Sequence, residues 1–146
     1  MKNKLFIIAF TFFIVTGIFA ESAPGLTMEQ YTQAIRQNPD DGAAYFYRGL
    51  LFAQRGDFYR AVADWTEVIQ LYPDHAIAYN NRGNAYHDLG DLDRAIADYT
   101  QVIRLNPTAR VFNDRGDAYF NKDDLDRAIS DFEAALRIDP NESHAR

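Results

Sequence analysis

The sequence predicts an all-α protein, an α-solenoid of antiparallel helix hairpins, and two observations support that fold class. Four prolines mark a regular period: Pro39, Pro73, Pro107 and Pro140 are spaced by 34, 34 and 33 residues. Between these prolines, apolar residues recur at the three- and four-residue spacing of a helix. A period of this length is typical of a solenoid, because one helix hairpin cannot bury its apolar face without a neighbouring copy.

The N-terminal residues differ from the repeated part. Lys2 and Lys4 precede an uncharged run from Leu5 to Ala20 that is rich in Phe and Ile. A basic start, a short apolar run and a small residue before the break are typical of a secretory signal peptide. The run is shorter than the ~20 residues of a membrane-spanning helix, so we favour cleavage after Ala20 over an uncleaved anchor. We therefore expect residues 1–20 to be a signal peptide and residues 21–26 a linker.

Residues 27–41 are predicted to form an N-terminal capping helix. The stretch "TMEQYTQAIRQNP" aligns with the second half of a unit, with Tyr31 in the place of Trp65. Thr27 and Gln30 have the spacing of a capping box, in which each side chain accepts a hydrogen bond from the other residue's backbone. An end of a solenoid needs such a cover.

Three full units follow, at residues 42–75, 76–108 and 109–140, and residues 141–146 are left as a C-terminal tail. Each unit is predicted as two helices. The recurring residues are the glycines Gly49, Gly83 and Gly116, the alanines Ala61, Ala95 and Ala128, and the aromatic residues Trp65, Tyr99 and Phe132. Small residues let two helices approach each other, and the aromatic side chains fill the space beside them.

The turn inside each unit has its own signal. Gly56 and Gly90 are suited to the left-handed residue that ends a first helix. The residues that follow the turn are predicted N-caps of the second helices: Asp57, Asp91 and Asp124. In the third unit Asp123 replaces the glycine, at a cost of about 1 kcal/mol if it is left-handed.

The third unit also lacks one residue between Pro107 and Gly116, so we expect it to be the least regular. No amphipathic capping helix follows Pro140. The outer face of the last helix, near Leu136 and Ile138, is therefore expected to be open.

Each unit also repeats an arginine and an aspartate sixteen residues apart. The pairs are Arg48 with Asp64, Arg82 with Asp98, and Arg115 with Asp131. The arginines could form a row of anion-binding groups. We favour a structural ion pair across each hairpin, because a guanidinium and a carboxylate form a strong two-pronged contact and pairing makes partial burial tolerable.

These units resemble the tetratricopeptide repeat family over residues 42–140. In the middle unit the matching residues are Gly83 to Tyr86, Gly90, Asp91, Ala95, Tyr99 and Pro107. The resemblance implies a right-handed superhelix whose first helices line a concave groove for extended peptides. Carried over to this chain, the groove residues would be Phe46, Leu50, Ala53, Gln54, Asn80, Asn84, His87, Asp88, Asn113, Asp117, Phe120 and Asn121.

The implied groove would be apolar at one end and polar and acidic at the other, since Phe46 and Leu50 correspond to Asn80 and Asn84. Packing of Phe46 under the N-terminal helix is an equal alternative. Some family members clamp a terminal carboxylate with basic residues. Here Phe46, Leu50 and Asp114 replace members of that clamp, Asn81 matches it, and Arg110 is a possible substitute, so we do not expect this type of recognition.

Composition excludes several function classes. The chain has no cysteine, and His75, His87 and His144 lack ligand spacing, which argues against disulfides, a thiolate metal site and a histidine metal site. No catalytic constellation is present in the sequence, so we expect no enzyme and no cofactor. The net charge of -6, or -8 after removal of Lys2 and Lys4, argues against nucleic acid and favours a neutral or basic partner.

We therefore expect an exported bacterial protein, periplasmic or secreted, that binds a protein or peptide segment in its groove. After signal removal we expect no membrane association. The alternative is a structural module that forms a homodimer through the uncovered C-terminal helix face.

Overall fold

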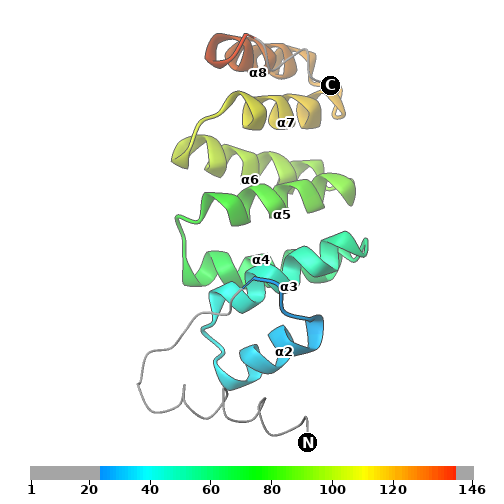
Figure 1. Ribbon diagram of the computed structural model, residues 1–146. Coiled ribbons are helices and arrows are strands. Elements are labelled where there is room, and N and C mark those ends of the chain that lie inside the picture. The colour runs from blue at the N-terminus through cyan, green and yellow to red at the C-terminus, as the bar shows by residue number, and fades with distance from the viewer. Residues whose placement is uncertain (1–23, 141–146) are drawn as a thin grey trace, which may run out of the picture.

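The computed structural model describes residues 24–140, and the predicted signal peptide and C-terminal tail lie outside this range. The described residues form seven α-helices and no strand, stacked in chain order from one end to the other (Figure 1). The helices are α2 (Met28–Gln37), α3 (Gly42–Gln54), α4 (Phe58–Leu71), α5 (Ala76–Asp88), α6 (Leu92–Leu105), α7 (Ala109–Phe120) and α8 (Leu125–Ile138). The predicted all-α solenoid of helix hairpins is confirmed. None of the described helices has the length and apolar character needed to cross a membrane.

Every helix begins after a side chain that accepts a hydrogen bond from its first turn. Thr27 and Gln30 form the capping box that the sequence predicts for α2. Each second helix begins after its predicted aspartate: Asp57, Asp91 or Asp124. The first helices are capped by Asp41, His75 and Thr108. Because these caps satisfy orphan backbone donors locally, the helix starts could be predicted from sequence.

The turns within the three hairpins share the same backbone geometry. Gly56, Gly90 and Asp123 are left-handed, with φ of 75°, 76° and 60°. In the third unit the amide of Asp124 donates to the carbonyl of Tyr119 at 3.0 Å, as Asp91 does to Tyr86 at 2.8 Å. Asp123 therefore adopts the predicted strained conformation without changing the turn.

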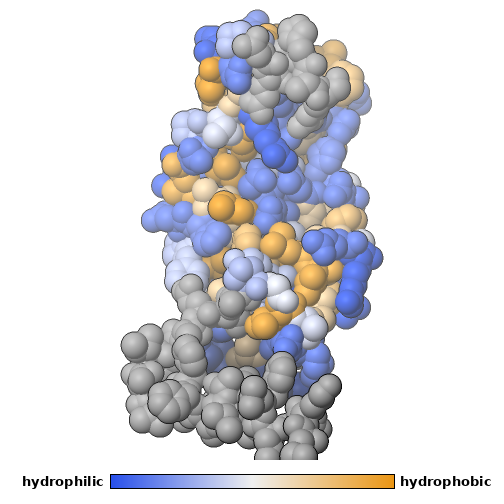
Figure 2. Space-filling view, viewed as in Figure 1, coloured by the Kyte–Doolittle hydropathy of each residue, from blue (hydrophilic) through white to orange (hydrophobic). Residues whose placement is uncertain are grey.

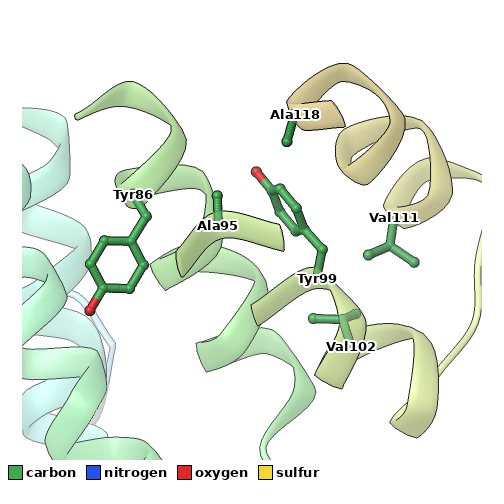
Figure 3. Close-up of a cluster of buried hydrophobic side chains, with 6 residues drawn as sticks. All are labelled: Tyr86, Ala95, Tyr99, Val102, Val111 and Ala118. Carbon is green, nitrogen blue, oxygen red and sulfur yellow. The ribbon is translucent and has the colours of Figure 1, made fainter. Parts of the chain in front are cut away.

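The deletion in the third unit is absorbed by a loop. Residues 72–75 separate α4 from α5, whereas residues 106–108 separate α6 from α7. Helix α7 still packs on α6, with Val111 and Ala118 in one buried cluster with Tyr99 and Val102 (Figure 3). A shorter loop is tolerated because the contacts that hold α7 are made along its length.

The recurring glycines allow the two helices of a hairpin to touch. A Cβ on Gly83 would lie 2.9 Å from the ring of Tyr99, closer than carbon atoms can pack. Gly49 and Gly116 meet Trp65 and Phe132 in the same way, at 2.8 and 2.7 Å. The glycine and the aromatic residue sixteen positions later therefore form one packing unit in each hairpin.

Candidate functional site

The three arginine–aspartate pairs are present in the structure. In the middle unit, Arg82 donates from Nε and Nη2 to the two carboxylate oxygens of Asp98, both at 2.8 Å. The same two-pronged contact joins Arg48 to Asp64 and Arg115 to Asp131. All three aspartates are buried.

Electrostatics favour charge retention on the arginine. The hydrogen bond to Asp98 raises the pKa of Arg82, and that to Asp131 raises the pKa of Arg115. Burial raises the pKa of Asp64, against the opposing effect of the hydrogen bond from Arg48. These arginines neutralise buried carboxylates inside the hairpins, so they do not form an exposed row for anions.

The remaining guanidinium nitrogen of each arginine joins neighbouring units. Nη1 of Arg82 donates to Oγ1 of Thr66 in α4 at 3.0 Å, and Nη1 of Arg115 donates to Thr100 in α6 at 3.0 Å. Arg48 reaches Thr32 of α2 at 3.3 Å. The sequence interpretation missed these threonines, although Thr32, Thr66 and Thr100 recur every 34 residues.

A first pocket of about 390 Å³ opens where α3, the end of α4 and the start of α5 meet. Its lining is mostly aromatic and aliphatic: Phe46, Tyr47, Val68, Tyr72, His75 and Ile77, with Gly42 and Ala43. The ring of Phe46 packs against Tyr47 and His75, with centroids 5.5 and 5.4 Å apart. Tyr47 rather than Phe46 stacks on Tyr31 of the N-terminal helix, at 5.8 Å.

A second pocket, of about 310 Å³, lies at the equivalent position one unit further along. Its lining is more polar: Asn80, Asn106, Thr108 and Arg110 join Ala76, Ile77, Val102 and Val111. Ile77 borders both pockets and is 61% exposed. Because Asn80 and Asn106 replace Phe46 and Tyr72, the same site changes from apolar to polar along the stack.

A third pocket, of about 300 Å³, lies between α5, α6 and α7 and is acidic. Asn84, His87 and Asp88 of α5 face Asp114 and Asp117 of α7, with Tyr99 of α6 between them. The hydroxyl of Tyr99 donates to Oδ1 of Asn84 at 2.8 Å. Burial, with the charges of Asp114, Asp88 and Asp117, raises the pKa of Tyr99. The tyrosine thus remains neutral, and the pocket carries a negative potential suited to a cationic side chain.

The structure brings some of the expected groove residues together and leaves others apart. Phe46, Asn80, Asn84, His87, Asp88 and Asp117 line the three pockets. Nδ2 of Asn121 lies 3.0 Å from Nε2 of His87, which places Asn121 beside the acidic pocket.

The other expected residues do not line these pockets. Leu50 and Ala53 pack against the buried cluster of the first unit. Gln54 and Phe120 are exposed at the ends of α3 and α7, and Asn113 is half-buried in α7. Many pocket residues were absent from the expected set, among them Tyr47, Tyr72, Ile77 and Tyr99. Only the contact between units shows that these residues reach a pocket.

The face in Figure 2 shows hydrophobic side chains interspersed among hydrophilic ones. Within residues 24–140, no group of three or more His, Asp or Glu side chains has a geometry that could hold a metal ion. The three pockets therefore differ in polarity, from aromatic and aliphatic to polar to acidic.

Comparison with protein families gives one consistent result. Profiles of the tetratricopeptide repeat match residues 76–108 and 109–142, a profile described as TPR repeat matches residues 49–90, and a further tetratricopeptide repeat profile matches residues 29–65. No curated protein matches the chain.

Solved structures of tetratricopeptide repeat proteins share the fold. A crystal structure of MamA has a TM-score of 0.75 at 24% identity, covering 80% of this chain and 69% of that chain. MamA of Desulfovibrio magneticus RS-1 has a TM-score of 0.74 at 25% identity, covering 79% and 66%. The first TPR of Spaghetti (RPAP3), bound to the HSP90 peptide SRMEEVD, has a TM-score of 0.65 at 24% identity, covering 69% and 81%. This chain spans about two thirds of the MamA chains that it matches.

Proposed function

We propose that this chain, which belongs to the tetratricopeptide repeat family, binds an extended segment of a partner protein along the groove formed by α3, α5 and α7. Repeats of this family generally mediate protein–protein interaction, and a structural neighbour holds a peptide. The observation that carries the proposal is the set of three pockets on these helices: an aromatic one at α3 and the start of α5, a polar one at the starts of α5 and α7, and an acidic one further along α5 and α7.

The pockets specify the chemistry of the segment. An aromatic or aliphatic side chain matches the pocket around Phe46, Tyr72 and Ile77. A lysine or arginine matches the pocket of Asp88, Asp114 and Asp117. A segment of this kind differs from an acidic peptide tail. The replacement of clamp residues by Phe46, Leu50 and Asp114, two of them in the place of basic residues, agrees with that difference. A basic segment would also be attracted by the acidic chain as a whole.

In this proposal the protein is an adaptor and not an enzyme, and it acts after export to the periplasm or the medium. The support for export is the composition of residues 1–20. Mass spectrometry of protein from culture fractions would test it: we expect an N-terminus at Glu21 outside the cytoplasm. An intact N-terminus in the cytoplasmic fraction would contradict export without affecting the groove.

The groove can be tested with a displayed library of random peptides, followed by calorimetric titration of the selected sequences. We expect selected peptides to combine an aromatic or aliphatic residue with lysine or arginine. Ile77→Glu should weaken their binding about tenfold or more, because it places a charge between two pockets. Asp88→Asn with Asp117→Asn should weaken binding and reduce its dependence on salt.

Tyr59→Glu is the matched control, since Tyr59 is 77% exposed on α4 and lines none of the three pockets. It should leave binding unchanged. Selection of acidic peptides, or binding insensitive to both groove variants, would reject the proposed groove.

The alternative function is self-association. Leu125, Ile129 and Leu136 of α8 are 53%, 56% and 42% exposed, which favours a contact at this end of the stack. Light scattering over a concentration series would detect the homodimer. A dimer that is lost on Ile129→Asp would support this alternative, and a monomer at all concentrations would exclude it.

A further inference from the structure

The second helices carry equivalent apolar stripes, and only the last is uncovered within the described residues. The stripe is Phe58, Val62, Trp65 and Ile69 in α4, then Leu92, Ile96, Tyr99 and Ile103 in α6, and finally Leu125, Ile129, Phe132 and Leu136 in α8. The residues of the first two stripes are all buried or half-buried, whereas three of the four in α8 are exposed. A chemically similar face is thus left open at α8.

The covered stripes show what kind of helix fits such a face. Helix α5 covers α4 with two small residues seven apart, Ala78 and Ala85, both in the cluster of Trp65. Helix α7 covers α6 in the same way with Val111 and Ala118, which face Tyr99 and Val102 in Figure 3. Small side chains on the covering helix let it settle between the large residues of the stripe.

Each covering helix also places one arginine on the polar edge of the stripe. Arg82 donates to Thr66 in α4, and Arg115 donates to Thr100 in α6. The position equivalent to these threonines in α8 is Glu133, which is exposed. A carboxylate at this position would accept the same hydrogen bond, strengthened by opposite charge.

A second polar contact follows the same edge. Lys122, just after α7, pairs with Asp93 at the start of α6. The equivalent residue in α8 is Asp126, which is also exposed. Asp126 and Glu133 are seven residues apart, so they lie on one side of the apolar stripe. The open face therefore combines large apolar residues with two carboxylates at the places where α6 receives Arg115 and Lys122.

We propose that the outer face of α8 binds an amphipathic helix of a partner protein. This helix carries an arginine between two small apolar residues and a further basic side chain that faces Asp126. In the covering helices the arginine follows the first small residue by four positions and precedes the second by three, as in Val111, Arg115 and Ala118. The partner helix takes the place on α8 that α7 takes on α6, and its arginine reaches Glu133.

In a second copy of this chain, residues 24–140 do not offer such a helix. Among the described helices the pattern occurs in α5 and α7, and both are packed between neighbours in the stack; in α3, Leu51 takes the place of the second small residue. The exposed α8 of a second copy would present the same bulky residues and the same two carboxylates. The two carboxylates of the face thus favour a helix of another protein with basic side chains opposite them over self-association.

The probe for this surface is a synthetic peptide with the sequence of residues 107–123, which contains Val111, Arg115, Ala118 and Lys122. It is titrated into isotopically labelled, purified protein and followed by NMR, which also detects weak binding. We expect chemical-shift changes centred on α8. Ile129→Asp should raise the dissociation constant at least about tenfold, because it puts a charge into the stripe.

The arginine contact has its own test. Glu133→Gln in the protein, or Arg115→Gln in the peptide, should each weaken binding about threefold, and the two changes together should weaken it no further. The matched control is Ile138→Asp: Ile138 is 49% exposed but lies nine residues from Ile129, on the opposite side of α8. The expectation that Ile138 shares the open face with Leu136 was therefore wrong, because two residues turn a helix by about 200°. The Ile138→Asp variant should leave the dissociation constant unchanged.

Three results would overturn the proposal: no shift changes, shift changes confined to α3, α5 and α7, or equal losses for Ile129→Asp and Ile138→Asp. A concentration-dependent dimer that blocks the peptide would do so as well, because it would make a second copy the occupant. Ile129→Asp should fold because Ile129 is exposed. If Ile129→Asp does not fold, Glu133→Gln still tests the proposal.

Discussion

Arg82 contacts three helices at once. It lies on α5, pairs with Asp98 of α6, and donates to Thr66 of α4. The rings of Tyr79 and Tyr86 lie 5.6 and 5.9 Å from its guanidinium carbon, which adds cation–π contacts. One side chain therefore links the two helices of its own hairpin and the hairpin before it.

Replacement of Arg82 by alanine should destabilise the protein by about 3–5 kcal/mol, because the buried carboxylate of Asp98 loses its countercharge. The double variant Arg82→Ala, Asp98→Ala should lose less than the sum of the single variants, and urea denaturation of all four proteins measures the difference. Additive losses would show that the pair does not act as a unit.

The turn between the helices of a hairpin is governed by one backbone angle. Gly56 and Gly90 adopt positive φ without steric cost, whereas Asp123 carries a side chain at φ 60°. The turn of the third unit is otherwise equivalent, with its N-cap Asp124 in place. The N-cap and the hydrogen bonds of the turn thus hold Asp123 in a conformation that it does not favour.

Asp123→Gly should stabilise the protein by about 0.5–1 kcal/mol, since it relieves the left-handed strain while glycine adds some entropy to the unfolded chain. Thermal unfolding followed by circular dichroism measures the change. Gly90→Ala is the reciprocal control and should destabilise the second turn. A loss of stability in Asp123→Gly would mean that the aspartate side chain makes a contact worth more than the strain.

The whole molecule is a stack in which each helix contacts mainly its neighbours along the chain. The stability of such a solenoid is a sum of unit terms and interface terms, so units at the ends are held less firmly than those inside. Helix α8 has α7 on one side and, within the described residues, nothing on the other. Its exposed Ile129 and Leu125 mark the missing interface.

Amide hydrogen exchange should therefore be slowest in α4, α5 and α6, and the free energy of local opening should be lower in α8 by about 2 kcal/mol or more. Exchange measured by NMR on the free protein gives these values helix by helix. Binding of the peptide 107–123 to α8 should raise the free energy of local opening of α8 and bring it closer to that of α4, α5 and α6. Equal protection in α6 and α8 would mean that the stack opens only as one cooperative unit.

Most of the fold was predictable from sequence because its signals are local. The helix starts at Asp57, Asp91 and Asp124, the left-handed turns and the hairpin repeat depend on residues close in the chain, and three copies strengthen each signal. The arginine–aspartate interpretation relied on the same constancy, a spacing of sixteen residues in every unit.

Contacts between units could not be predicted in the same way. Asn84 and Asp117 lie in one pocket with Tyr99, whereas Leu50 packs into the core and Phe120 lies exposed at a helix end. Helical periodicity assigns a residue to a face only to within about one turn, and the packing of one hairpin on the next sets the rotation of each helix. The repeat pattern thus determined the hairpin, its caps and its turn, while the packing of hairpins decided which side chains meet in the groove and which stripe stays open.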